Sequence, residues 1–176
     1  MKKLLTIFLF GLVLSGCASV EVPQARSNLI AANYEAVDAL LAGIPMATDQ
    51  PLLVATLVNV DVLTESSRLG RLFSEQIAAR LTKRGFPVKE LKLRENLFMK
   101  QSEGELLLSR EVSEVSKAQN ARAVVVGTYA ASNSMLYVNL KLVNPTGNVV
   151  LAAHDYSLPL DGNISDLLGR RKTTPF

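Results

Sequence analysis

Only a few side chains in this sequence have types and positions that could take part in chemistry. Cys17 is the only cysteine among 176 residues, so it has no partner for an internal disulfide, and its thiol could instead accept a lipid. His154 is the only histidine and is followed by Asp155, which could form an acid–base pair. Neighbouring residues of a strand point to opposite faces, however. We therefore expect His154 to be a hydrogen-bonded or exposed strand residue.

The first 16 residues have the pattern of a bacterial signal peptide. Lys2 and Lys3 give it a positive start, and residues 4–14 are almost all apolar but too short to span a bilayer, which takes about 20 residues. The tetrapeptide Leu14-Ser15-Gly16-Cys17 resembles a lipobox, where the thiol takes a diacylglycerol and the chain is cut before the cysteine. Ala18 stands where an inner-membrane retention signal would have Asp, so the resemblance points to the outer membrane. The alternative is an ordinary signal peptide followed by an incidental free cysteine.

The other motifs do not form a catalytic or metal site. The sequence has no glycine-rich phosphate loop, no nucleophile elbow around a serine, and no His and Cys cluster with metal-ligand spacing. We expect no enzyme activity, no cofactor and no metal. Four acidic residues are interpreted as the solvated face and first turn of a helix rather than a cation site: Glu103, Glu105, Glu111 and Glu114. Five basic residues are interpreted as a solvated or partner-facing stripe rather than a nucleic-acid helix: Arg68, Arg71, Arg80, Lys83 and Arg84.

Composition and charge divide the chain into four parts. After residues 1–16, residues 17–27 form the lipidated cysteine and a short tether, residues 28–160 a single domain, and residues 161–176 a helical turn and a loose tail. Net charge falls from +3 to +1 when Lys2 and Lys3 are removed, which excludes a strong electrostatic attraction for nucleic acid despite a sequence pI near 9.1.

The first half of the domain shows helical and strand patterns in alternation. Apolar residues at steps of three and four predict a helix from Asn28 to about Leu41. The apolar run 51–58 predicts a buried strand, and residues 59–67 a polar loop. The clearest helix runs from about residue 65 or 66 to 84, capped by Thr64 or Ser66 and closed by Gly85. Residues 86–93 predict a strand with a bulge or an edge position.

The second half ends in an antiparallel hairpin. We expect a helix over 105–119, a central strand over 121–127, and strands over 136–143 and 149–158 joined by the turn Asn144-Pro145-Thr146-Gly147. The order is α-β-α-β-α-β-β-β. Because helices link the early strands, these should lie parallel through right-handed crossovers. The predicted fold is α+β or α/β, with a mixed sheet of about five strands.

The loop from Asp61 to Gly70 is the stretch most suited to binding. It joins a buried strand to the clearest helix, and loops at strand C-terminal ends are common binding positions in α/β sheets. A glycine in the first turn of a helix costs up to about 1 kcal/mol relative to alanine, so Gly70 suggests close approach of another backbone. That backbone belongs either to this fold or to a neighbouring subunit. Candidate protein-contact residues are therefore Ser67, Arg68, Gly70 and Arg71.

Three segments resemble the FlgO family of flagellar outer-membrane lipoproteins. They are Pro51 to Asp61, Leu63 to Leu81 and Arg84 to Arg94, and the later Ala123 to Tyr129 also fits. The resemblance covers roughly residues 35–160 and is specific over 51–94. The family is not defined by catalytic residues, so it implies a structural component that supports the flagellum at the outer membrane, and hence motility. Implied partners are the outer membrane, through acyl chains on Cys17, and flagellar basal-body or other envelope proteins. The resemblance also implies assembly into a homo-oligomer or ring. The alternative is an envelope lipoprotein that regulates peptidoglycan synthesis or forms part of a secretion assembly.

Overall fold

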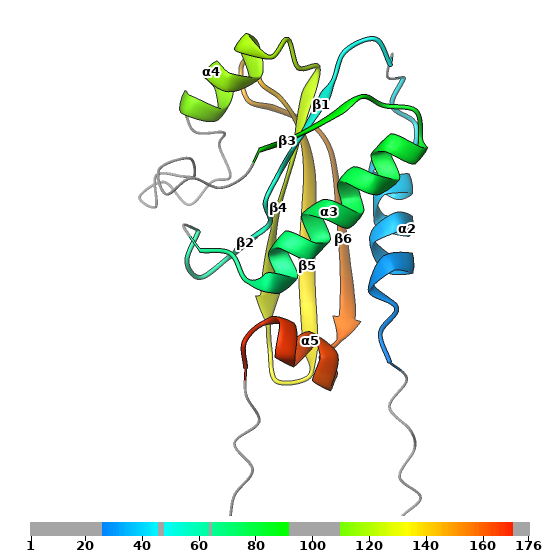
Figure 1. Cartoon of the computed structure of the whole chain (residues 1–176), viewed down its shortest axis with the longest axis vertical. Helices are drawn as coiled ribbons and strands as arrows, with labels where there is room; N and C mark the ends of the chain where they lie inside the picture. The colour runs from blue at the N-terminus through cyan, green and yellow to red at the C-terminus, as the bar shows by residue number, and fades with distance from the viewer. Residues whose placement is uncertain (1–25, 46–47, 64, 92–109, 171–176) are drawn as a thin grey trace, which may run out of the picture.

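A computed structural model of the chain describes residues 26–45, 48–63, 65–91 and 110–170 (Figure 1). The elements in chain order are α2 (Leu29–Leu41), β1 (Leu52–Ala55), β2 (Val58–Asn59), α3 (Arg68–Lys83), β3 (Val88–Leu91), α4 (Arg110–Ala118), β4 (Ala123–Ala131), β5 (Met135–Asn144), β6 (Val149–Pro159) and α5 (Gly162–Leu167). The predicted α+β class and the predicted element order are confirmed.

The strands form one mixed sheet in the order β3-β1-β4-β5-β6, with β2 paired to β4. The strands β3, β1 and β4 are parallel, and β4, β5 and β6 are antiparallel, as the linking helices and the hairpin signal predict. The short β3 lies at one edge, which confirms the edge position expected for it. The long β6 forms the other edge.

The sheet has six strands rather than about five because the predicted strand over 51–58 is broken. At the break, the Leu57 N–H donates to the Ser74 hydroxyl (2.9 Å), and the Ser66 hydroxyl donates to the Leu57 carbonyl (2.7 Å). Side chains just before α3 (Ser66) and within it (Ser74) thus replace the strand partners of Leu57. The cap of α3 also differs from the prediction, which named Thr64 or Ser66. The Ser67 side chain accepts a hydrogen bond from the Gly70 N–H and caps the helix.

The main hydrophobic core lies between α2, α3 and one face of the sheet (Figure 1). Phe73, Ile77 and Leu81 of α3 are fully buried there, as the apolar stripe of that helix predicts. On the opposite face of the sheet, a smaller cluster covers β1 and the beginning of β4. Its buried members are Leu53, Ala55, Val124, Val126 and Val143. Thr128 and Ala130, which follow Val124 and Val126 on the same face of β4, are outside this apolar cluster.

The turns and the chain ends largely follow the predicted pattern. The β5–β6 turn has Gly147 and Asn148 at positive φ (84° and 55°), and the predicted helical turn after residue 160 is α5. Helix α4 falls within the predicted range 105–119, of which residues 105–109 lie outside the described residues. The start of α2, α5 and the C-terminal ends of β4 and β6 all lie at one end of the sheet (Figure 1).

Candidate binding face

The junction between β2 and α3 holds the four residues that the sequence singles out. The Ser67 N–H donates to the Tyr129 hydroxyl (2.9 Å), and the Ser67 side chain caps α3. Arg68 donates to the backbone carbonyl of Asp166, which ties α3 to α5. Arg71 is exposed. Ser67, Arg68 and Gly70 thus have contacts inside the fold, and both arginines are exposed on the solvent side of the junction.

Gly70 is explained by packing within the chain. A Cβ at this position would lie 2.3 Å from the Leu57 carbonyl oxygen and 2.5 Å from the Ser66 hydroxyl, and both distances are far below normal contact. The glycine therefore lets α3 approach the backbone at the break between β1 and β2. Of the two explanations for this glycine, close approach within the same fold accounts for it fully.

His154 and Asp155 lie on opposite faces of β6, as expected for strand neighbours. His154 is paired with the buried Leu140, and its ring stacks on Tyr156 at 6.2 Å between centroids. Asp155 is paired with Asn139 on the other face. The two side chains therefore do not form an acid–base pair.

The open face of the sheet carries two neighbouring rows of side chains across β4, β5 and β6. The first row is Thr128, Asn139 and Asp155, which are direct partners across the strands. The second row is Ala130, Tyr137 and Ser157, one pleat closer to the end of the sheet where α5 lies. Because alternate residues share a face, all six belong to the side of the sheet away from α2 and α3.

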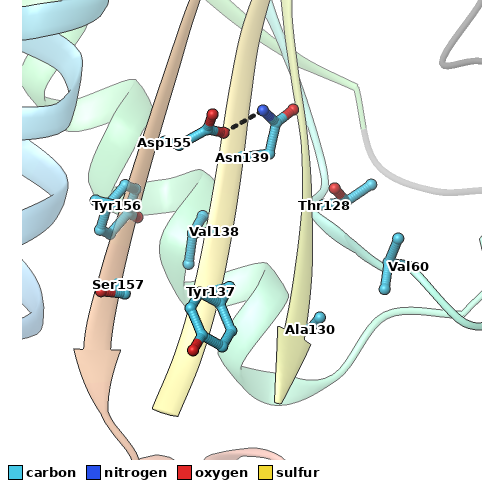
Figure 2. Close-up of a pocket in the computed structure, with 9 residues that line it drawn as sticks. All are labelled: Val60, Thr128, Ala130, Tyr137, Val138, Asn139, Asp155, Tyr156 and Ser157. Carbon is cyan, nitrogen blue, oxygen red and sulfur yellow. Dashed lines mark hydrogen bonds between the residues drawn. The ribbon is translucent and has the colours of Figure 1, made fainter. Parts of the chain in front are cut away.

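These rows line a hollow of about 420 Å³ (Figure 2). Val60, after β2, borders it at one side, and Asp155 and Ser157 of β6 border it at the other. The Asn139 amide donates to the Asp155 carboxylate, and Figure 2 shows its carbonyl oxygen turned to the side of Thr128. The Tyr137 side chain is 53% exposed, which is large for an aromatic residue in the middle strand of three.

Two neighbouring residues of the first row are largely buried at the floor of the hollow. Thr128 is only 6% exposed and lines the hollow. The side-chain carbonyl oxygen of Asn139 is buried and has no hydrogen-bond partner within the described part of the chain. An unpaired buried polar group costs about 1–3 kcal/mol. A face that keeps such a group suits a ligand that supplies the missing bond.

The sequence pattern identifies only part of this face. Alternation in 136–143 places Tyr137 and Asn139 on the same side of a strand, and 149–158 is predicted as the partner strand. The strand over 121–127, however, was predicted to end before Thr128. In the structure β4 continues to Ala131, which adds Thr128 and Ala130 to the face. The turn signal that would have revealed this longer strand is weak, since Ser132, Asn133 and Ser134 contain neither Gly nor Pro.

The charged Asp161, at the end of the sheet where α5 lies, stabilises the fold. The Asp161 carboxylate accepts from the Ile164 N–H (2.8 Å) and from the Ser27 N–H (2.9 Å), so it caps α5 and holds the first residues of the domain. Burial acts to raise the pKa of Asp161, but these backbone hydrogen bonds outweigh it and hold the pKa below its ordinary value.

The described residues contain no group of three or more His, Cys, Asp or Glu side chains that could hold a metal ion. Within the same residues, no helix is both long and apolar enough to cross a membrane. The lipobox residues Leu14, Ser15, Gly16 and Cys17 lie outside the described part of the chain, as do the acidic residues Glu103 and Glu105. Lipid attachment therefore stays a prediction.

The fold is shared with solved structures at low sequence identity. The C-terminal domain of LpoB from Salmonella enterica has a TM-score of 0.54 and 14% identity, covering 75% of this chain and 98% of that one. The same domain from Escherichia coli gives a TM-score of 0.52 and 14% identity with equal coverage. The solution structure of Escherichia coli LpoB gives 0.50 and 14% identity, covering 77% of this chain and 71% of that one.

The sequence comparisons agree with the resemblance of the strand and helix segments. No curated protein sequence matches the chain significantly. The family model described as FlgO protein matches residues 34–163, a range that contains every strand of the sheet, the whole of α3 and most of α2. The chain therefore belongs to the FlgO family.

Proposed function

We propose that this protein is a lipid-anchored component of the outer membrane that supports assembly of the flagellum and hence motility. The observation that carries the proposal is the FlgO family match over residues 34–163. The lipobox-like sequence ending at Cys17 supports an anchor in the membrane. The protein acts through binding rather than catalysis in this proposal, in keeping with the separation of His154 and Asp155 on opposite faces of β6.

The fixed part of the domain begins close to the anchor in the sequence. Ser27 is held by Asp161 and by the Pro159 carbonyl (3.0 Å), so Ser27 lies ten positions after Cys17 in the sequence, with nine residues between them. At no more than about 3.5 Å per residue, this tether reaches about 35 Å. The end of the sheet with α5 and the start of α2 would therefore face the membrane surface (Figure 1).

The contact with a partner is proposed at Arg68 and Arg71, positioned by Ser67 and Gly70. Arg71→Glu reverses an exposed charge without touching the core, so the protein should fold normally while motility falls. Ala79→Glu, at an exposed position of the same helix, is the matched control and should leave motility unchanged. If Arg71→Glu leaves motility normal, Arg71 is not part of the partner contact.

The proposal as a whole is tested by deleting the gene and complementing it. The deletion should impair swimming and flagellar assembly, and the wild-type gene should restore both. Cys17→Ser should abolish palmitate labelling, release the protein from membranes and fail to restore swimming. A deletion strain that swims normally with intact flagella would contradict the flagellar role, and labelling that persists in Cys17→Ser would contradict the anchor.

The second candidate is an envelope lipoprotein that regulates peptidoglycan synthesis or belongs to a secretion assembly. The fold similarity to LpoB is the reason to retain this second candidate, because the similarity extends over 98% of the LpoB domain. Neighbouring genes distinguish the two: flagellar genes beside this one favour the first proposal, and wall-synthesis genes favour the second.

A further inference from the structure

The hollow on the open face of the sheet combines an exposed aromatic ring with a row of polar side chains. We propose that it binds an amino-sugar glycan strand of the bacterial cell wall, with the ring of Tyr137 against one face of a sugar and with Thr128 and Asp155 bonding its hydroxyl and acetamido groups. This inference rests on the envelope location in the proposed function, and it assigns a ligand to a face that the proposed protein contact at Arg68 and Arg71 does not use.

Tyr137 supplies the aromatic surface. It is 53% exposed, and its cross-strand neighbours Ala130 and Ser157 are small. An aromatic ring carries negative charge on its faces, whereas the C–H bonds on one side of a pyranose ring carry partial positive charge. A sugar ring can therefore stack on this side chain without large aliphatic groups around it.

The polar row beside Tyr137 supplies both donors and acceptors. The Thr128 hydroxyl can donate and accept, while the Asp155 carboxylate accepts only. One Asp155 oxygen accepts from the Asn139 amide, and the other accepts no hydrogen bond among the described residues. Sugar hydroxyls also donate and accept, and an acetamido group adds one N–H and one carbonyl. The ligand thus matches the groups that the fold leaves unpaired in the hollow.

A protein partner fits this face less well. Protein interfaces depend on clusters of large apolar and aromatic side chains at their centre. In the hollow, Val60 and Tyr137 are the exposed large side chains, whereas Val138 is buried and Tyr156 half-buried. The polar row crosses β4, β5 and β6 beside them. Exposed aliphatic side chains gather instead at Val149, Val150 and Leu151, at the far end of β6.

The test uses the full lipidated chain in a detergent without sugar headgroups, titrated calorimetrically with the tetramer of N-acetylglucosamine. Purified cell-wall sacculi and lipopolysaccharide serve as further probes in co-sedimentation. Tyr137→Ala removes the stacking surface, and Thr128→Val replaces a hydroxyl with a methyl group of similar size. Each should weaken binding of the tetramer and of sacculi about tenfold or more. Tyr34→Ala, on α2 across the sheet, should not.

The outcomes separate clearly. Binding of the tetramer and sacculi that falls in both variants, with unchanged thermal transitions, supports the glycan site. Absence of binding overturns it, as does binding that neither variant alters. Preferential binding of lipopolysaccharide over sacculi also overturns it. The same holds if Tyr137→Ala weakens the binding of a protein partner but not of the tetramer or of sacculi. These measurements use purified protein, so they stand apart from the motility results that test the proposed function.

Discussion

At the scale of single residues, some side chains determine how the elements pack, whereas others are exposed to solvent. Gly70 and Ser67 bring α3 against the broken strand, while Arg71 faces outward. On the other face, the buried side-chain oxygen of Asn139 has no hydrogen-bond partner within the described residues. The fold thus supplies hydrogen-bond partners for the polar groups where α3 begins. On the open face it leaves a polar group without a partner among the described residues.

Gly70→Ala should destabilise the domain by about 1–3 kcal/mol, because its Cβ would collide with the Leu57 carbonyl and force a backbone shift. The matched control is Gly162→Ala, where a Cβ meets nothing within 4 Å and should change stability by no more than about 1 kcal/mol. Thermal denaturation of both variants measures the difference. Equal stability of the two would show that α3 does not pack this closely.

Tyr156→Phe should also destabilise the domain, by about 1–3 kcal/mol. Burial raises the pKa of the Tyr156 phenol, so it stays protonated and donates to the fully buried Asn33, whose amide donates in turn to Gln76 (2.5 Å). Removal of the hydroxyl leaves the Asn33 oxygen without this donor. Tyr34→Phe removes a hydroxyl that faces the exposed Lys83 (3.2 Å), and urea denaturation should show a change below about 0.5 kcal/mol. The contact with Asn33 would be unimportant if both variants behaved alike.

At the scale of elements, the caps and breaks depend on contacts that cross the fold. The helices, the parallel strands and the last hairpin follow from periodicity and turn residues, and the structure confirms them. The break at Leu57 could not be read from the run 51–58, since it is created by the hydroxyls of Ser66 and Ser74 in another element. The end of β4 was missed for a similar reason, because pairing with β5, not local propensity, extends it to Ala131.

The candidate site was predicted only in part on the same grounds. Local spacing pointed to the β2–α3 junction, and the structure gives Gly70 an internal role there. The hollow depends on three strands in register, so its rows appear only when Thr128, Asn139 and Asp155 are placed side by side. Sequence alternation alone assigned Tyr137 and Asn139 to one face without showing what surrounds them.

The cap of α5 makes a pH-dependent prediction. Asp161→Ala should cost about 0.5–2 kcal/mol at neutral pH, because the variant loses the bonds to Ile164 and Ser27. The pKa of Asp161 is lowered in the fold, so its contribution is present above the ordinary value of 3.8 and is lost as pH falls through the lower folded value. The stability difference from wild type should hold down to about pH 4 and shrink below it. Asp166→Ala, an exposed carboxylate in the same helix, is the control. A difference that shrinks already near neutral pH would contradict this role.

At the scale of the whole molecule, both ends of the described domain meet at one end of the sheet. Asp161 joins Ser27 to α5, and Arg170 donates to the carbonyls of Ala131 and Ser132 at the same end. These contacts fix both ends of the folded domain beside each other. If Cys17 carries the proposed lipid, the open face and the α3 arginines lie on the sides of a domain whose base is held near the membrane.

The core between helices and sheet must stay intact for any of these surfaces to exist. Ile77→Asp places a charge where no solvent reaches and should abolish the cooperative thermal transition. Glu75→Ala, exposed on the same helix, should leave the transition within a few degrees of wild type. A folded Ile77→Asp protein would show that α3 packs through a different face.

The most direct test of the central claim is to isolate flagellar basal bodies with the outer membrane attached and to probe them for this chain. The account predicts that the wild-type protein co-purifies with these basal bodies, and that Cys17→Ser is depleted from them. If the wild-type protein is found throughout the outer membrane but is absent from the basal bodies, a structural role at the flagellum is contradicted.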